Sequence, residues 1–297
     1  MLQFLLDTLV RTSDLALIAL GLSLVYGLVK FPNIAHVQYA MAGAYTTYAL
    51  NTMGLPLAVA VLLSCALAGC LTVLLHVLVF SRLLRSGPAI TMIGSLAVAM
   101  LIVAITLGLG GSFPLLFKRP LEAPISIGDV LIGRTQLYAV AATIALLTLF
   151  TLLLFFTRTG RAMRALSTNR ALAAASGLNA QGITHLVNFS SGALAALGGS
   201  MLALASGAHV NMGYDLLLPV FAAAIIGGLG NPLGAVAGAC LIAATETLVT
   251  NIDFGPLLGR QLVFLPVSYI GAASFLMLLA ALLFKPYGLF DREVRRV

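Results

Sequence analysis

The polar side chains of this sequence gather in residues 32–52, where histidine, asparagine, glutamine, tyrosine and threonine interrupt a long apolar run. On a helix, Gln38, Met41, Tyr45, Tyr48 and Thr52 recur at steps of three or four residues, so they share one face. Such a face can line a water-filled passage, or it can pack against a neighbouring helix through hydrogen bonds. We favour the passage, because packing alone requires fewer polar groups. The candidate residues along it are Asn33, His36, Gln38, Tyr39, Met41, Tyr45 and Tyr48.

Glu246 is the acidic residue that lies deepest within an apolar run. A carboxylate at the centre of a spanning helix costs about 2.5 to 3.5 kcal/mol on insertion scales, so Glu246 is expected to face protein or water. A proton relay needs several ionisable groups inside the membrane, and His36 is the one plausible companion in this sequence. We therefore expect Glu246 to have a structural or gating role.

Glycines recur shortly before Glu246, and Gly230, Gly234 and Gly238 fall four residues apart, although Pro232 is expected to start a new helix. Small residues at this spacing allow two helix backbones to approach closely, at a subunit interface or around a narrow gate. We favour packing over the gate. The residues of this site are Gly227, Gly228, Gly230, Gly234, Gly238 and Glu246.

The composition indicates which class of protein positions these residues. Of 297 residues, 8% are charged and 61% are hydrophobic, whereas a soluble domain carries about 25% charged residues. Long runs contain no Asp, Glu, Lys or Arg: 31–81, 86–117, 135–157, 171–214, 216–245 and 261–284. Each run can span a bilayer, which needs about 20 apolar residues per helix. The sequence therefore predicts an all-α membrane protein, and its net charge of +7 reports topology rather than nucleic-acid binding.

The runs divide into a polytopic bundle of eight to ten membrane-spanning helices in one domain, 1–297. The chain is expected to break, or to form a re-entrant segment, near Pro32. Cys65, Cys70 and Cys240 lie inside apolar runs, where packing is expected and a disulfide or metal site is not. The expected spans are 15–29, 34–50, 57–80, 89–109, 135–156, 183–205, 216–229, 233–249 and 263–284.

The charges between the spans indicate the orientation, because Lys and Arg stay on the cytoplasmic side. Eleven basic and two acidic residues fall on one face, and five basic and six acidic residues, including Asp7, Arg11 and Asp14, fall on the other. The first face is therefore expected to be cytoplasmic and to carry the carboxyl terminus. The amino terminus is external if nine segments each cross the membrane once. A re-entrant segment near Pro32 would place the amino terminus on the cytoplasmic side instead. Residues 110–134 form the expected external loop.

The internal segment 158–182 has structure of its own. Its arginines recur at spacings of three, three and six residues and give way to an alanine-rich helix that Ser176 and Gly177 should end. This predicts one or two short amphipathic helices outside the lipid. They either anchor the chain at anionic headgroups or dock in the groove of a partner protein.

Four stretches resemble a known family. Segment 158–182 contains Thr159-Gly160-Arg161-Ala162, then Arg164-Ala165, then Ala175-Ser176-Gly177-Leu178-Asn179. The other stretches are Tyr26-Gly27 with Asn33, Ala35, His36, Met41, Gly43, Ala44 and Tyr45; Gly227-Gly228-Leu229-Gly230 with Pro232, Gly234, Ala235, Gly238 and Glu246; and Pro286-Tyr287-Gly288-Leu289. In this order they resemble, over nearly the whole chain, the inner-membrane permease subunits of branched-chain amino acid ABC importers.

The resemblance implies that segment 158–182 couples the spans to a separate ATPase through Arg158, Gly160, Arg161, Arg164, Arg170, Ala174 and Gly177. It implies a multi-pass protein of the bacterial inner membrane, in contact with lipid and with a second homologous permease, two cytosolic ATPases and an external solute-binding protein. ATP and Mg²⁺ would be bound by those ATPases, because this sequence contains no G-x-x-x-x-G-K-[ST] motif. The chain itself is expected to hold no cofactor, no catalytic residue and no enzymatic activity.

The sequence departs from the family pattern beside His36. A glycine commonly follows that histidine and an acidic residue often comes next, whereas this chain has Val37 and Gln38. Branched-chain or related hydrophobic amino acids are the expected substrates, and urea, short amides and aromatic acids are the alternatives within the family. An ion-coupled carrier that works alone and a membrane assembly protein without transport are the alternatives outside it.

Overall fold

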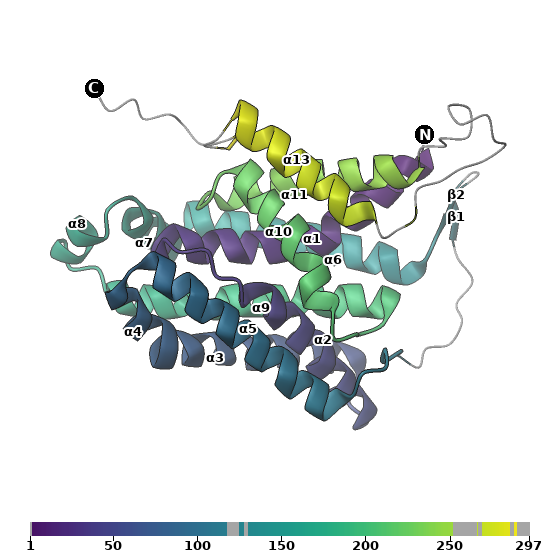
Figure 1. Cartoon of the computed structure of the whole chain (residues 1–297), viewed down its shortest axis with the longest axis horizontal. Helices are drawn as coiled ribbons and strands as arrows, with labels where there is room; N and C mark the ends of the chain where they lie inside the picture. The colour runs from purple at the N-terminus through teal and green to yellow at the C-terminus, as the bar shows by residue number, and fades with distance from the viewer. Residues whose placement is uncertain are drawn as a thin grey trace.

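The structure, a computed structural model, describes residues 2–117, 125–127, 130–251, 266, 269–285 and 288–289. These residues are almost entirely helical, and most of the helices lie lengthwise in one bundle (Figure 1). A short hairpin of β1 (Ile125–Ile127) and β2 (Val130–Ile132) pairs in antiparallel register. The prediction of an all-α polytopic bundle is confirmed.

Six helical stretches of the described chain are long and apolar enough to cross a membrane. They are α1 (Leu2–Val29), Leu57–Ser86, α5 (Pro88–Gly110), α6 (Arg134–Phe156), α9 (Ala180–Ser206) and α11 (Pro232–Asn251). The second comprises α3 (Leu57–Leu75), the π-helical turn η1 (His76–Phe80), α4 (Ser81–Leu83) and the 3₁₀ turn η2 (Leu84–Ser86). Two shorter apolar helices, α10 (Met212–Gly227) and α13 (Ile270–Phe284), and the more polar α2 (His36–Thr52) bring the described helical stretches into the predicted range.

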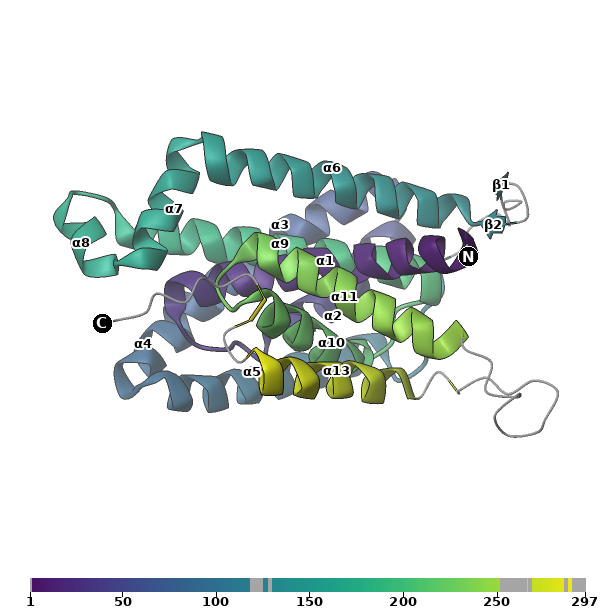
Figure 2. The same ribbon diagram turned by 90° about the horizontal axis from the view of Figure 1, so that it is seen from above.

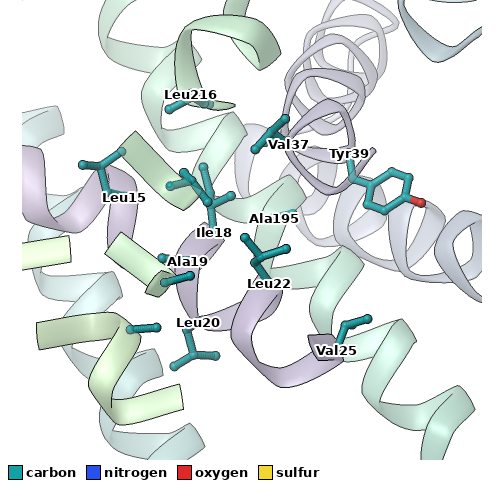
Figure 3. Packing of buried hydrophobic residues seen from close by; sticks show 14 of the residues in the cluster. Leu15, Ile18, Ala19, Leu20, Leu22, Val25, Val37, Tyr39, Ala195 and Leu216 are labelled. Atoms are coloured by element: carbon teal, nitrogen blue, oxygen red, sulfur yellow. The ribbon is translucent and has the colours of Figure 1, made fainter. Parts of the chain in front are cut away.

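Helix α1 is the central element of the bundle. In its most apolar window 89% of the residues are buried, against 17% in α6, which lies along one edge (Figure 2). In a membrane such contacts stabilise the bundle through close packing rather than through transfer from water. Buried side chains of four helices meet around α1 (Figure 3): Leu15 and Ile18 of α1, Val37 of α2, Ala195 of α9 and Leu216 of α10.

The first helix is longer than the span expected over 15–29. The helix begins at Leu2 and includes Asp7, Arg11 and Asp14, which were expected to lie outside the membrane. Arg11 pairs with Glu246 of α11, with 2.6 Å between Nε and Oε2. The charge of Arg11 is therefore neutralised by a residue of another helix.

The chain breaks between α1 and α2, as predicted near Pro32. Lys30 has a φ of 59°, in the left-handed region, and a non-helical segment then runs back into the bundle (Figure 1). The Asn33 Oδ1 accepts a hydrogen bond from the Ala35 amide, and the Ile34 amide donates to Ser95 Oγ of α5, at 3.1 and 3.0 Å. Non-helical backbone is tolerated at membrane depth only where protein satisfies it in this way. Helix α2 therefore starts inside the protein.

The two ends of the bundle differ. Helices α7 (Arg158–Thr168) and α8 (Arg170–Ala175) project from one end, and the β hairpin lies at the other, beside the first turn of α1 (Figures 1 and 2). We call them the α7–α8 end and the hairpin end. The described basic residues of the α7–α8 end are Lys30, Arg82, Arg85, Arg158, Arg161, Arg164, Arg170 and Lys285. The described acidic residues lie on the half of their helices toward the hairpin end: Asp7, Asp14, Asp215 and Glu246.

The loop expected over 110–134 runs from the end of α5 to the start of α6. Within it, Leu115 forms an isolated β-bridge with Ala208, beyond the end of α9. Several predicted segments lie outside the described residues: 118–124 and 128–129 of this loop, most of the first part of the span expected over 263–284, Pro286 and Tyr287, and the carboxyl terminus.

Candidate functional site

A cavity of about 630 Å³ lies between α2, α3 and α5, toward the hairpin end. We call it the α2–α5 cavity. Among the described residues no charged side chain lines it, and its wall combines aliphatic side chains with the hydroxyl groups of tyrosine and threonine. The main lining residues are Tyr45, Thr46, Tyr48 and Thr52 of α2, Leu71 of α3, and Ile102, Ile105 and Thr106 of α5.

The hydroxyl of Tyr45 is a buried polar group without a hydrogen-bond partner among the described residues. Thr46 and Thr52 already donate to backbone carbonyls of their own helix, at 2.7 and 2.8 Å. Leaving a group such as the Tyr45 oxygen unpaired costs about 1 to 3 kcal/mol, so a hydrogen bond to this oxygen would be stabilising. The cavity thus suits a small solute with an apolar body and a polar group.

Only Tyr45 and Tyr48, among the seven residues predicted for a solute path, line the α2–α5 cavity. The Tyr48 ring packs edge-on against Phe117, with 5.4 Å between ring centroids. The other five residues lie on the first half of α2 or just before it, in the protein interior: Asn33, His36, Gln38, Tyr39 and Met41.

His36 is held by two hydrogen bonds in the interior. Its Nε2 lies 2.9 Å from the Ile18 carbonyl oxygen of α1, and its Nδ1 lies 3.2 Å from Ser191 Oγ of α9. These bonds join three helices at a position where His36 is 1% exposed. His36 therefore makes the contacts expected of a residue that packs helices together.

Gln38 packs against the first turn of α10, where a side chain on Gly213 would collide with it. Its Oε1 is buried without a partner in the described part of the chain. Met41 is also fully buried, in the core. The polar face of α2 is therefore covered by other helices in its first half, and it borders the cavity in its second half.

Sequence reasoning missed the wall that α5 contributes. Ile102, Ile105 and Thr106 of this helix line the cavity. From its sequence α5 was expected only to be an apolar membrane span. The spacing of Thr91, Ser95 and Thr106 puts them on one side of the helix, and this was the signal that the sequence offered. The structure buries all three residues. Such a side of a membrane helix is expected to face protein or a cavity rather than lipid.

The segment 158–182 forms two capped helices at the α7–α8 end. The Thr157 Oγ1 accepts a hydrogen bond from the Gly160 amide, and the Asn169 Oδ1 accepts one from the Leu172 amide, each at 3.0 Å. These caps satisfy amides that a helix start leaves unpaired. Gly177, with a φ of 85°, follows the last turn of α8 in the conformation that favours glycine.

One side of α7 packs on the bundle and the other is open. Gly160, Met163 and Leu166 are buried, and a side chain on Gly160 would collide with the Leu154 carbonyl oxygen of α6. Arg158, Arg161, Arg164, Arg170, Ala174 and Gly177 are all exposed. A groove of about 620 Å³ between α7 and α8 is lined by Arg161, Arg164, Ala165, Thr168, Asn169, Leu172, Ala173 and Ser176. We call these exposed residues and the groove the α7–α8 surface.

The glycines before Glu246 form the contact between α10 and α11. A side chain on Gly227 would meet the Gly234 carbonyl oxygen, and one on Gly238 would meet the Ala223 carbonyl oxygen. Helix α10 ends at Gly227, two residues before the end of the span expected over 216–229, and α11 starts at Pro232, as the sequence predicts. Gly228 and Gly230 connect the two helices with φ values of 95° and 92°, which other residues rarely adopt.

Glu246 joins three helices near the hairpin end. Its carboxylate accepts hydrogen bonds from Arg11 Nε of α1 and from Ser274 Oγ of α13. His36, the one candidate partner for a proton relay with Glu246, bonds to Ile18 and Ser191 instead. The described residues contain no group of three or more His, Cys, Asp or Glu that could hold a metal ion.

Comparisons with known proteins identify the family. The profile described as branched-chain amino acid transport system / permease component matches residues 4–284. The high-affinity branched-chain amino acid transport system permease protein BraD of Pseudomonas aeruginosa is 28% identical, over 100% of this chain and 98% of its own. The corresponding permease protein LivH of Escherichia coli is 24% identical, over 100% and 97%.

A solved structure, PsaBC from Streptococcus pneumoniae in complex with Fab, has a similar fold. Its TM-score is 0.51 at 16% identity, and the match covers 94% of this chain and 91% of the other. This likeness supports the fold alone, whereas the family follows from the profile. The chain belongs to the permease components of branched-chain amino acid transport systems.

Proposed function

We propose that this chain is the membrane-spanning permease subunit of an ATP-driven ABC importer for small hydrophobic amino acids. The α7–α8 surface carries the proposal. It offers exposed arginines beside a partly apolar groove, which is the chemistry of a protein docking site. Helix α7 also packs on α6, α9 and the central α1, so a partner that moves α7 would move the core of the bundle.

The proposed assembly contains a second homologous permease, two cytosolic ATPases and an external solute-binding protein. ATP and Mg²⁺ would bind to the ATPases, which would supply the free energy as a shift between outward-open and inward-open states. The excess of basic residues at the α7–α8 end supports a cytoplasmic location for that end and for the carboxyl terminus, in the bacterial inner membrane. The hairpin end, with the amino terminus of α1, would then be external.

Reversing the charge of the α7–α8 surface should release the ATPase. For the double variant Arg161→Glu, Arg170→Glu we expect at least about a tenfold fall in copurified ATPase and in ATP-dependent uptake, because like charges across an interface cost several kcal/mol. The control is Arg82→Glu, a charge reversal at the same end but outside the groove. Retained ATPase in the double variant would contradict docking there, and uptake by the chain alone, driven by a proton or sodium gradient, would support a carrier instead.

We also propose that the α2–α5 cavity receives the apolar side chain of a branched-chain or related amino acid during transport. The largely aliphatic wall that the described residues form supports this assignment, as do the names of the two relatives. Urea and short amides would leave most of that wall without contacts. Competition of leucine uptake by valine, urea, acetamide and phenylacetate distinguishes these substrate classes.

Removing the Tyr45 hydroxyl should slow transport. We expect Tyr45→Phe to lower the rate of leucine uptake by about three- to tenfold, because one hydrogen bond contributes about 0.5 to 1.5 kcal/mol. The matched control is Tyr138→Phe, since Tyr138 is 70% exposed on α6 and lies outside this cavity. Uptake of radiolabelled leucine into cells, normalised to permease in the membrane, measures both. Unchanged uptake of every solute tested would remove Tyr45 from the path.

A further inference from the structure

A second cavity, of about 220 Å³, lies at the α7–α8 end between α1, α6, α7 and the start of α11. We call it the α1–α6 cavity. The described residues that line it include no acidic side chain, and most of them are apolar. The principal apolar contacts come from Leu24 and Leu28 of α1, Leu154 and Phe155 of α6, Met163 of α7 and Leu233 of α11.

Arg164 separates this apolar cavity from the exposed groove between α7 and α8, because it lines both. Its guanidinium carbon lies 4.9 Å from the centroid of the Phe155 ring. No carboxylate pairs with Arg164 in the described part of the chain. The guanidinium is therefore held at the mouth of the cavity with its charge available to an anion.

The depth of the cavity matches the boundary between acyl chains and headgroups. Phe155 is the penultimate residue of α6, a helix of 23 residues. At 1.5 Å per residue such a helix is about 35 Å long, which is slightly more than the hydrocarbon core of a bilayer. Phe155 and the Arg164 guanidinium above it thus lie where the hydrocarbon ends.

We propose that the α1–α6 cavity binds one acyl chain of an anionic phospholipid, whose phosphate pairs with Arg164. An apolar wall does not hold ordered water well, but it accepts a hydrocarbon chain. The headgroup would meet an end of the protein where the described residues include eight basic and no acidic side chains. A free phosphate would use the same guanidinium and leave the apolar wall without contacts. The inference does not depend on the proposed transport function.

Photolabelling tests the site directly. The full-length protein, with any subunits that copurify, is reconstituted in phosphatidylcholine vesicles that contain a phosphatidylglycerol with a photoreactive acyl chain. After irradiation, adducts are mapped by peptide mass spectrometry. We expect them to concentrate at Leu24, Leu28 and Phe155. Unlabelled phosphatidylglycerol should compete, whereas phosphatidylcholine and glycerol phosphate should not.

Two variants probe the two parts of the site. Arg164→Leu should reduce the adducts by about tenfold, as expected for loss of a charge-assisted contact. Leu28→Phe should also reduce them by filling the cavity while leaving Arg164 in place, so the test does not depend on one variant folding. Arg82→Leu, which removes a positive charge from the same end outside the cavity, should leave them unchanged.

Several outcomes would overturn the proposal. Adducts spread evenly along the spanning helices, or equal labelling by a phosphatidylcholine probe, would mean that no anionic lipid is selected. Competition by glycerol phosphate would assign the site to free phosphate. Labelling that occurs only in protein stripped of its partner subunits would assign the cavity to a segment of a partner.

Discussion

Replacing Arg11 with alanine is expected to lower the free energy of unfolding by about 3 to 5 kcal/mol, the cost of breaking a buried ion pair by removing one member. The carboxylate that remains, Glu246, is only 2% exposed and would keep just its hydrogen bond from Ser274. Glu246→Ala should cost less, because Arg11 is 26% exposed and its long side chain can extend toward water. Unfolding of the purified variants in mixed micelles, followed by helical content, measures both changes.

A double replacement and an exposed ion pair provide the controls. Arg11→Met combined with Glu246→Leu should recover most of the lost stability, since apolar residues of similar volume often substitute for a buried pair without net cost. Asp215→Asn breaks the exposed contact with His209, in which the two side chains are 67% and 34% exposed, and should change stability by less than about 1 kcal/mol. If Arg11→Ala costs no more than Asp215→Asn, the pair does not stabilise the bundle.

The same pair explains why the start of α1 could not be predicted. Composition and the spacing of charges were sufficient to predict an all-α membrane bundle, and the two prolines were sufficient to predict the break near Pro32 and the start of α11 at Pro232. Arg11 and Asp14 looked like residues outside a span, because a charge inside the membrane is costly unless it is paired. The partner of Arg11 lies 235 residues away in the sequence, and only the folded chain brings it near.

The candidate site was predictable to a similar degree. The polar face of α2 predicted Tyr45 and Tyr48 as path residues, and both border the α2–α5 cavity. It could not distinguish them from Gln38, because a helical face has one spacing along its whole length, whereas the neighbours that cover it change. The break at Lys30 places the first half of α2 in the interior, beside α1, α9 and α10.

The short motifs of the internal segment were more informative. A cap of an α-helix involves residues two or three positions apart, so its geometry is local and the sequence contains it. Thr157, Asn169 and Gly177 mark the limits of α7 and α8 for this reason. Which molecule covers the α7–α8 surface is a property of an assembly, and one chain does not contain that information.

Gly238→Ala is expected to lower the free energy of unfolding by about 1 to 3 kcal/mol, the usual range for overpacking a close contact. The added carbon would collide with the Ala223 carbonyl oxygen of α10. A carbonyl of a helix backbone cannot rotate away as a side chain can, so α10 and α11 would have to separate. The matched control is Gly108→Ala on α5, where an added carbon meets nothing within 4 Å. Because alanine has the higher helix propensity, that variant should be unchanged or more stable by up to about 1 kcal/mol.

Uptake measured on the same variants distinguishes packing from gating at the α10–α11 contact. A packing role predicts that uptake by Gly238→Ala falls only in proportion to the folded protein in the membrane, since each folded molecule retains the same path. A gate predicts full amounts of folded protein with little uptake. We expect the first result, because the backbone atoms that Gly227, Gly234 and Gly238 approach belong to the adjoining helix of the same chain. None of these glycines borders the α2–α5 cavity. A fully folded but inactive Gly238→Ala would therefore place the constriction of the path at this contact, away from the cavity.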